Sequence, residues 1–417
     1  MKSRMCKKIK NKWSISLGSA LCFLGLAGCS FGGKSPETAD NMEGQEQEVT
    51  EGIVSENEVE PEQETEPEEP HIMIDAEASA CDLSRAMPVK GRPIDQTYGE
   101  VLAYIGGQPE GAEVDLMGHA LTYEEIADIL QLTQGQDVSF LYNVPLGELV
   151  IPCDTAEIMV SEMPLAEMDG FDFDTFISLF PNLESIEMCN CGYTNDEMAA
   201  ICDRHEDLRI IWEVHLEHWD FRTDIVAFTS DKTCADDFYM QNEDAKYLKY
   251  CKDLLALDLG HNYVNDLSFL EKLTNLRVLI LVDNVVYKRP DGSLHHLDDL
   301  SVLSNLTEMR YLEFFSNAVS DISFLNNMPK LMDLNISYNP IYDAGPLYNH
   351  PRLVRLWMEH TYIPASQVSA LRAAYPNTII VSEGEGSIDQ GWRANEHYYA
   401  MRRMFHENAV EDVFMQD

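Results

Sequence analysis

Cysteines and histidines in this 417-residue sequence form pairs that could begin a metal site. Cys189 and Cys191 make a C-x-C pair, but no second C-x-C or neighbouring H-x-H completes the four ligands of a structural zinc site. His215 and His218 lack a third ligand, and the adjacent histidines at 295–296 fall in an insertion. We therefore predict that the protein binds no metal, that its thiols are buried and inert, and that these histidines are solvated.

Acidic residues also occur at spacings typical of functional sites. Asp172 and Asp174 resemble the start of a calcium loop, but its glycine and closing glutamate are missing. Asp220, Arg222 and Asp224 carry groups that chelate or catalyse in other proteins, and a local ion-pair network is the simpler expectation. Because the chain has 72 acidic residues, two neighbouring acids carry little information.

Motifs of known enzyme classes are missing from the sequence. It contains no G-x-S-x-G elbow, H-E-x-x-H helix, P-loop or G-x-G-x-x-G turn. We therefore predict a protein that is not an enzyme and uses no cofactor. An extracellular hydrolase with its site between Ala78 and Asn242 is left open as an alternative.

The elements that would position any site are repeats of 22 residues. The longest interval between units, 33 residues, is one unit with an 11-residue insertion near Tyr287–Leu297. A constant period in the twenties is typical of a solenoid. The units begin at Leu254, Leu276, Met309, Leu331 and Leu353.

Each unit reads L-x-x-L-x-L-x-x-N-x-I-x-D-I-x-x-L, which closely resembles the bacterial, internalin-like class of leucine-rich repeat. The L-x-L step predicts a short strand with one buried face, and the end of the unit predicts a 3₁₀ or helical return. The resemblance implies an α/β solenoid, a right-handed superhelix with a parallel sheet on its concave face. A ladder of buried asparagines is expected to satisfy the turn backbone: Asn262, Asn284, Asn317 and Asn339.

Residues between the buried leucines are expected to face outward in three columns. The columns are Ala256, Val278, Tyr311, Asp333, Arg355; then Asp258, Ile280, Glu313, Asn335, Trp357; then Gly260, Val282, Phe315, Ser337, Glu359. Exposed apolar and aromatic strips are typical of binding surfaces. The predicted partner-binding residues are Ile280, Val282, Tyr311, Glu313, Phe315, Asn335, Arg355, Trp357 and Glu359. Cover by the insertion or by the C-terminal tail is the alternative.

The region before the regular repeats, residues 71–245, follows the same pattern less closely. Strand-like copies occur at Val114-x-Leu116, Ile158-x-Val160 and Ile186-x-Met188, with helices predicted at Tyr123–Leu132 and Asn195–Asp203. We predict divergent repeats here, with a separate small α/β domain as the alternative. Residues 219–242 are predicted to form an ordered loop between the two blocks.

The regular repeat domain is predicted over 246–382 and the tail over 383–417. Ile363–Tyr375 is predicted as a longer helical return and Thr378–Val381 as the last strand. Trp392–His406 places Tyr398, Met401 and Phe405 on one helical face. This helix is predicted to cap the last open repeat, and a partner-binding helix is the alternative.

The first 28 residues are predicted to be an export signal. Six bases precede a short apolar run, and Leu26-Ala27-Gly28-Cys29 resembles the lipobox of bacterial lipoproteins. The resemblance implies cleavage before Cys29 and a diacylglyceryl anchor, such as palmitate, on its sulfur. An ordinary secretory signal is the alternative. No later stretch reaches the ~18 apolar residues of a membrane helix.

The composition of the chain limits the kinds of partner that it is expected to bind. Residues 29–70 are predicted to be a disordered tether, because the part from Ser35 to Pro70 holds fourteen acids and no base or aromatic residue. The chain has a formal net charge of −43. Such a surface repels phosphate backbones, so nucleic acid is not an expected partner.

Together these patterns predict a binding protein tethered outside the membrane of a Gram-positive cell. Its repeat surface would bind a protein, peptide or glycan outside the cell. A solute-binding lipoprotein that feeds a transporter, with two α/β lobes around a cleft, is an alternative beside the hydrolase.

Overall fold

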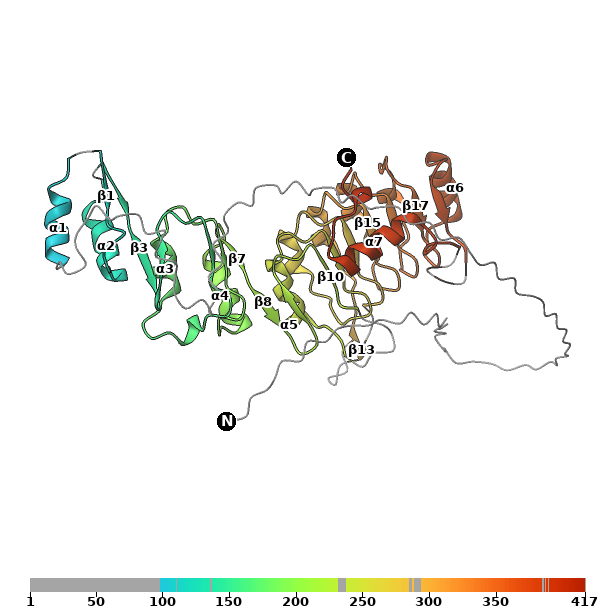
Figure 1. The fold of residues 1–417 in the computed structure, drawn as a ribbon. Coiled ribbons are helices and arrows are strands. Elements are labelled where there is room, and N and C mark those ends of the chain that lie inside the picture. Colours follow the sequence, from blue (N-terminus) through green and yellow to red (C-terminus); the bar gives the residue numbers. More distant parts are fainter. Residues whose placement is uncertain are drawn as a thin grey trace, which may run out of the picture. The chain divides into compact units, whose positions relative to one another are not determined.

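The computed structural model describes residues 98–416, except positions 110, 136, 232–237, 285, 286, 289–293, 385, 387 and 389. The predicted signal, the tether and Cys29 lie outside the described residues. Figure 1 shows the arrangement of the elements along the described chain.

The first block of elements alternates helices with short strands. A parallel three-stranded sheet in the order β5-β6-β7 places Ile158, Ile186 and Ile210 in register. Val114 lies instead in a separate parallel pair, opposite Phe140. The elements are α1 (Tyr98–Gly106), β1 (Ala112–Asp115), α2 (Tyr123–Leu132), β2 (Val138–Leu141), β3 (Asn143–Leu146), β4 (Leu149–Pro152), β5 (Glu157–Met159), η2 (Leu165–Glu167), α3 (Phe173–Ser178), β6 (Ser185–Glu187), α4 (Asn195–Arg204), β7 (Arg209–Ile211), β8 (Glu213–His215) and β9 (Asp220–Arg222).

The predicted helices at 123–132 and 195–203 are confirmed as α2 and α4. Both begin with a capping box, in which a threonine side chain accepts from a backbone N–H and a glutamate accepts from the threonine N–H. These reciprocal bonds are set by residues three apart, so the helix starts can be predicted from local sequence alone.

The second block is a leucine-rich-repeat fold built on a parallel seven-stranded sheet, in the order β10-β11-β12-β15-β16-β17-β18. Most strands are followed by a short 3₁₀ return, and the last return is a helix, α6 (Figure 1). The elements are β10 (Ala227–Thr229), α5 (Asn242–Ala245), η3 (Lys246–Tyr250), β11 (Ala256–Asp258), η4 (Ser268–Lys272), β12 (Val278–Ile280), β13 (Tyr287–Lys288), β14 (Leu294–His295), η5 (Ser301–Asn305), β15 (Tyr311–Glu313), η6 (Ser323–Asn327), β16 (Asp333–Asn335), η7 (Gly345–Leu347), β17 (Arg355–Trp357), α6 (Ala365–Ala374) and β18 (Ile379–Val381).

The repeat pattern fixes the register of this sheet. Leu257, Leu279, Leu312, Leu334 and Leu356 are paired strand to strand in one row, and each is fully buried. Residues paired between neighbouring strands are separated along the chain by the length of one repeat unit. A slip of this pairing by one residue would turn every leucine to the other face of the sheet.

The predicted loop over 219–242 is wrong in its first half. Residues 220–222 form β9, which pairs antiparallel with β8, and residues 227–229 form β10, the first strand of the seven-stranded sheet. The sheet therefore begins before residue 246, where the regular repeat was predicted to start. The strand was missed because Ala227-Phe228 lacks the L-x-L step, although Phe228 pairs with Leu257 and is buried.

Two apolar cores follow from this architecture. The larger core runs from Val101 to Leu371 and contains the leucine row. The smaller core lies on the opposite face of the sheet and includes residues of α7 (Glu396–Glu407) and of η8 (Asp412–Phe414). The sheet is thus covered on both faces.

Candidate binding face and its covering segment

The three predicted columns form one continuous surface, which we call the outer sheet face. Ala256, Val278, Tyr311, Asp333 and Arg355 are aligned by strand pairing, and so is the column from Asp258 to Trp357. The register of the sheet therefore confirms the first two columns, and the third column, from Gly260 to Glu359, follows the paired residues of each strand.

The predicted exposure of this face is wrong. Ile280, Val282, Tyr311, Phe315 and Trp357 are all buried, with exposed fractions from 0% for Tyr311 to 8% for Phe315. Glu313, Asn335, Arg355 and Glu359 are also buried. Their cover is the C-terminal segment (residues 390–416), which was the alternative considered from the sequence. Partner binding by these residues remains a prediction.

The helix of the C-terminal segment forms as predicted but lies elsewhere. α7 contacts β10 and β11, at the beginning of the sheet, whereas the predicted cap would cover the last repeat. Ala400, Met401 and Met404 form its buried face, and Tyr398 and Phe405 are partly buried against the same core. The amphipathic pattern identified the apolar side of the helix but not the surface that receives it.

Apolar anchors of the C-terminal segment fit between side chains of the outer sheet face. The Trp392 indole is fully buried, with its ring centroid 5.1 Å from that of Trp357 and 5.7 Å from that of Tyr311. The Arg355 guanidinium lies over the same indole at 4.2 Å, a cation–π contact. Phe414 is fully buried against Tyr311.

Arginines from several repeats hold the backbone of the C-terminal segment. Arg277 donates to the Phe414 carbonyl at 2.9 Å, and Arg355 donates to the Trp392 carbonyl at 2.7 Å. Arg310 and Arg352 both donate to the carbonyl of Gln416. Hydrogen bonds from a charged donor are stronger than those between neutral groups, so these four arginines hold the backbone of the segment firmly.

Asn408 joins the same segment to the edge of the sheet. It ends α7 in the left-handed conformation, and its side-chain oxygen accepts from the Val226 and Ala227 backbone N–H groups at 3.1 and 3.0 Å. These groups lie at the start of β10, so this bond anchors the end of the helix to the first strand.

Buried acids of the outer sheet face meet basic groups of the C-terminal segment. Asp333 is fully buried, accepts from Arg355 and lies 2.7 Å from the His397 imidazole. Burial raises the pKa of Asp258, and Arg402 opposes that rise. The cover therefore combines apolar contacts with complementary charges.

Glu313 is the buried carboxyl whose protonation bears most directly on this cover. Burial raises its pKa to about 7, while the hydrogen bond from the Tyr311 hydroxyl and the charge of Arg393 oppose the rise, and Asp258 adds to it. Because the folded state holds this proton more tightly than the unfolded state does, the contribution of Glu313 to stability is lost as pH rises from about 4.5 to 7.

We expect the Glu313→Gln variant to lack this loss. Relative to the wild-type chain, its free energy of unfolding should rise by about 3 kcal/mol between pH 4.5 and pH 7.5, from the size of the pKa shift. Urea titrations of both proteins across that range measure the difference. If the free energy of unfolding depended on pH in the same way for both proteins, Glu313 would be ionised in the folded state at no cost in stability.

The asparagine ladder lies at the carboxyl ends of the strands. Asn284 accepts from the Val264 N–H at 3.3 Å and donates to the Leu259 and Leu281 carbonyls at 3.0 and 3.1 Å. Asn339, two repeats further along, makes the equivalent bonds. It accepts from the Val319 N–H at 3.1 Å and donates to the Phe314 and Ile336 carbonyls. Asn262 and Asn317 make similar bonds to neighbouring backbone groups. Each amide therefore links adjacent turns.

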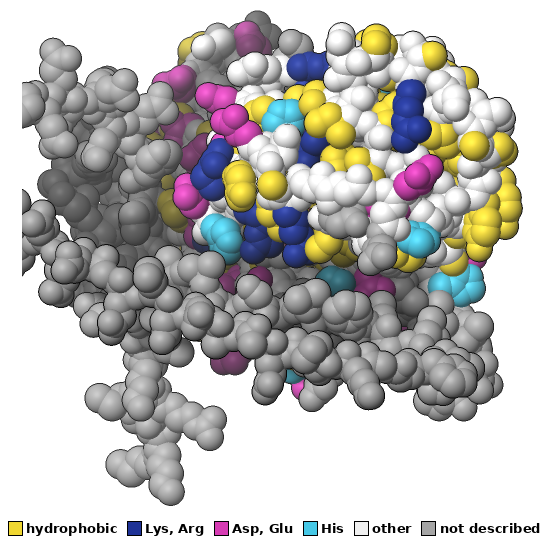
Figure 2. Space-filling view, turned by 90° about the vertical axis from the view of Figure 1, so that its right-hand side faces the viewer, with side chains coloured by type: hydrophobic (Ala, Val, Ile, Leu, Met, Phe, Trp, Pro, Cys, Tyr) yellow, Lys and Arg dark blue, Asp and Glu magenta, His cyan; other side chains and the backbone are white. Residues whose placement is uncertain are grey.

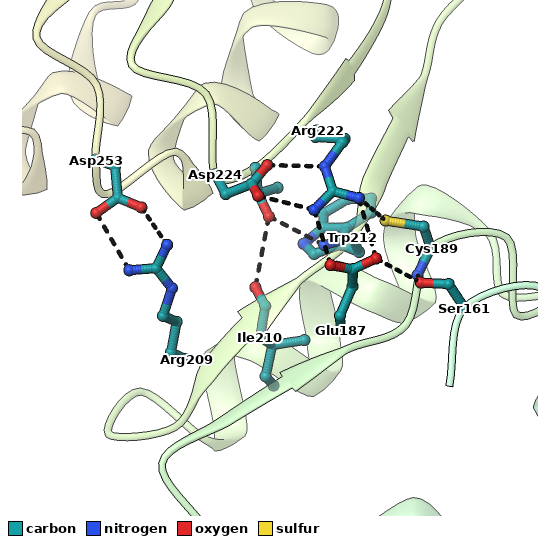
Figure 3. A network of polar contacts seen from close by, with 10 residues as sticks. Ser161, Glu187, Cys189, Arg209, Ile210, Trp212, Arg222, Asp224 and Asp253 are labelled. Carbon is teal, nitrogen blue, oxygen red and sulfur yellow. Dashed lines mark hydrogen bonds and ion pairs between the residues drawn. The ribbon is translucent and has the colours of Figure 1, made fainter. Parts of the chain in front are cut away.

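Figure 3 shows the polar network that contains Arg222. Its guanidinium binds Glu187 at 2.9 Å and Asp224 at 2.8 Å, which lowers the pKa of both carboxyls. Asp220 is not in this network and lies 3.1 Å from His215. The ion-pair interpretation therefore holds for Arg222 and Asp224, and the Arg222–Glu187 pair joins β9 to β6.

The remaining candidate cysteines are free and buried. Burial raises the pKa of Cys189 to about 11 and that of Cys191 to about 12, so both are thiols at neutral pH. Within the described ranges, no group of three or more histidine, cysteine or acidic side chains is placed to hold a metal ion.

The acids at 172 and 174 have structural contacts. Asp172 caps α3 by accepting from the Thr175 N–H at 2.8 Å. Asp174 pairs with Arg204 and His205, and these contacts lower its pKa. The side chain of His296 lies 3.1 Å from Asp298, and that of His295 is outside the described residues.

Sequence reasoning missed the arginines that hold the C-terminal segment. Arg277 and Arg310 occupy the same position of their repeats, directly before the strand, and are 33 residues apart like the units themselves. A basic residue recurring at one repeat position was the available signal. Figure 2, which views the chain from the side of α6, shows Lys and Arg side chains among hydrophobic ones on this face.

Comparison with known proteins gives only distant likenesses. No known protein family and no curated protein sequence matches the chain. Internalin C2 from Listeria monocytogenes is similar in structure at 22% identity and a TM-score of 0.28, over 40% of this chain and 76% of that one. Another Listeria monocytogenes internalin (inlF) aligns at 17% identity and a TM-score of 0.28, over 65% of this chain and 61% of that one. At these scores the likenesses carry no argument, so the fold assignment rests on the repeats and the sheet.

Among residues 98–416, apart from the undescribed positions, no helix combines the length and apolar character needed to cross a bilayer.

Proposed function

We propose that this chain is a lipid-anchored binding protein on the outer face of a bacterial membrane, and that it is not an enzyme. Its partner is a protein or peptide, which binds the outer sheet face. The seven-stranded parallel sheet supports the solenoid interpretation, a right-handed superhelix of stacked repeats. The Leu-Ala-Gly-Cys29 sequence supports the anchor.

One observation carries the proposal of a binding face. The outer sheet face already binds a polypeptide segment through Arg355 and a cluster of aromatic side chains, and three arginines outside its columns, Arg277, Arg310 and Arg352, also donate to carbonyls of that segment. A surface that only closes a core needs apolar side chains, whereas buried charges cost free energy unless they are paired. The arginines and acids of this face are the groups that a bound peptide satisfies.

A capture experiment tests the face. Trp392→Ala in the chain without residues 1–29 should loosen the C-terminal segment and increase capture of proteins released from the surface of intact cells. Adding Phe315→Ala and Trp357→Ala should reduce that capture by at least tenfold, since both rings lie on the outer sheet face.

Tyr399→Ala is the matched control for the first change, because that ring is 55% exposed on α7. It should capture no more than the wild-type chain does. Circular dichroism establishes that the variants remain folded. Undiminished capture after the two face substitutions would place the partner site elsewhere.

A further inference from the structure

The last strand of the seven-stranded sheet, β18, forms an open edge. β18 pairs with β17 on one side, and no strand in the described part of the chain pairs with it on the other. The predicted cap helix does not lie there, because α7 contacts β10 and β11 at the beginning of the sheet. Terminal units of a solenoid need cover, and an unpaired strand is a template for another strand.

The hydrogen bonds of β18 show which of its backbone groups face outward. The Ile379 N–H donates to the Val354 carbonyl at 2.9 Å, and the Val381 carbonyl accepts from the Met358 N–H at 2.8 Å. Because the backbone groups of successive strand residues point to opposite sides, the N–H and C=O of Ile380 face away from β17. Among the residues that the structure describes, neither of these two groups has a hydrogen-bond partner.

The opposite edge of the sheet is closed by the chain itself. There the Asn408 side-chain oxygen accepts from the Val226 and Ala227 N–H groups at the start of β10. After β18 the chain turns back over the sheet, where the Gly384 carbonyl oxygen lies 3.0 Å from the His360 imidazole. The described continuation of the chain therefore leads away from the outward side of β18.

The open edge lacks the features that prevent strand pairing. Edge strands are usually protected by charges, prolines or bulges, whereas residues 378–382 contain no charge and no proline. All three residues of β18 are β-branched, and Ile379 is 52% exposed. Residues 373–382 carry no charge, although 24% of the chain is charged. Since copies with a net charge of −43 repel each other, a neutral edge is where two copies can approach.

We propose that β18 pairs with the β18 strand of a second copy of this chain, antiparallel and about a two-fold axis at Ile380. In this register the two Ile380 residues exchange both of their N–H···O bonds. Thr378 and Ser382 face the same side as Ile380, so the Ser382 N–H of each copy donates to the Thr378 carbonyl of the other. The contact is closed at two copies, because each open edge is used once.

The helix of the last repeat permits this approach. Figure 1 shows α6 at the far end of the repeats, beyond β17. The exposed residues of α6 are four alanines, two serines and Arg372. Helices approach each other more closely when the side chains between them are small. The α6 helices of two copies can therefore lie side by side while the strands pair. This contact lies outside the outer sheet face, so the inference goes beyond the proposed function.

Sedimentation equilibrium of the chain without residues 1–29 tests the pairing. Because small interfaces bind weakly, the wild-type chain should pass from monomer to dimer between about 1 and 500 µM. Ile379→Lys places a charge on the open edge and should weaken the dimer about tenfold or more. Val410→Lys is the matched control, because Val410 is a β-branched residue that is 46% exposed on the C-terminal segment, and it should dimerise like the wild-type chain. Circular dichroism establishes that both variants are folded.

Disulfide formation tests the register. A Thr378→Cys chain mixed with a Ser382→Cys chain should form a covalent dimer under mild oxidation, because these positions are directly opposite each other and their Cα atoms are then close enough for a disulfide. Mass spectrometry of the digested dimer should identify a link between positions 378 and 382. The Ser382→Cys chain alone should not link through position 382, since its two copies lie at opposite ends of the paired strands.

Three results would overturn the inference. A chain that stays monomeric over the whole concentration range would show that the edge does not pair with a second copy. A dimer that Ile379→Lys leaves intact would place the contact elsewhere, and a link between two 378 positions would show a different register. A monomer whose edge takes up an unrelated extended peptide would assign the edge to another protein.

Discussion

Replacement of Trp392 by alanine is expected to lower the free energy of unfolding by about 3–5 kcal/mol, the usual cost of truncating a large buried aromatic side chain. The indole is fully buried and packs against the rings of Tyr311 and Trp357 and the guanidinium of Arg355. Its removal leaves a cavity between the sheet and the C-terminal segment and takes away the aromatic face beneath a buried charge. Urea denaturation of the chain without residues 1–29 measures the loss.

Tyr399→Ala supplies the control for this prediction. Tyr399 is an aromatic residue of the same segment, but its ring is 55% exposed, so its loss should change stability by no more than about 0.5 kcal/mol. Limited proteolysis adds a local measurement, because the Trp392→Ala chain should be cut near its C-terminus much faster than the Tyr399→Ala chain. A loss below about 1 kcal/mol for Trp392→Ala would mean that the C-terminal segment does not pack on the sheet.

Cys29→Ser is expected to abolish lipid attachment and membrane retention. The proposed anchor is a diacylglyceryl group on the Cys29 sulfur, and a serine hydroxyl in its place removes the thiol that becomes the thioether. Each buried methylene contributes ~0.8 kcal/mol to membrane binding, so two acyl chains hold a protein far more firmly than one does. Growth with labelled palmitate followed by membrane fractionation should show nearly all wild-type chain labelled and membrane-bound, and no label on the Cys29→Ser chain.

Cys22→Ser is the matched control for this change. Cys22 lies inside the apolar run of the predicted signal, seven residues before Cys29, and should not be lipidated. The Cys22→Ser chain should therefore keep the label and the membrane fraction of the wild-type chain. Equal labelling of the Cys29→Ser chain, or no labelling of the wild-type chain, would refute the lipoprotein proposal.

The covered sheet changes how the partner experiment must be designed. With the C-terminal segment in place, a partner meets Tyr399 and the exposed side of α7 before it meets any residue of the outer sheet face. Substitutions of Tyr311 or Trp357 alone would disturb the packing of the segment as well as any partner contact. For this reason the capture experiment first loosens the segment through Trp392, and only then alters the face.

The amino-acid sequence by itself determined the repeats and their register. The leucine row from Leu257 to Leu356, the asparagine ladder and the helix α2 all follow from patterns that span at most one or two repeat units. Such patterns are local: a strand alternates with period two, a capping box joins residues three apart, and one 22-residue unit specifies its neighbour. The apolar side of α7, which includes Met401, also follows from the helical spacing of residues in the sequence.

Only the tertiary structure decided which surface those anchors cover. Arg355 and Trp392 are 37 residues apart, Arg277 and Phe414 are 137 apart, and no periodicity relates them. An aromatic strip that binds a partner and one that packs against the chain's own C-terminus have the same composition, because both lower the free energy by removing apolar surface from water. Whether such a strip binds a partner or packs against the C-terminus depends on the path of the chain after β18. In the structure this path places α7 on the outer sheet face.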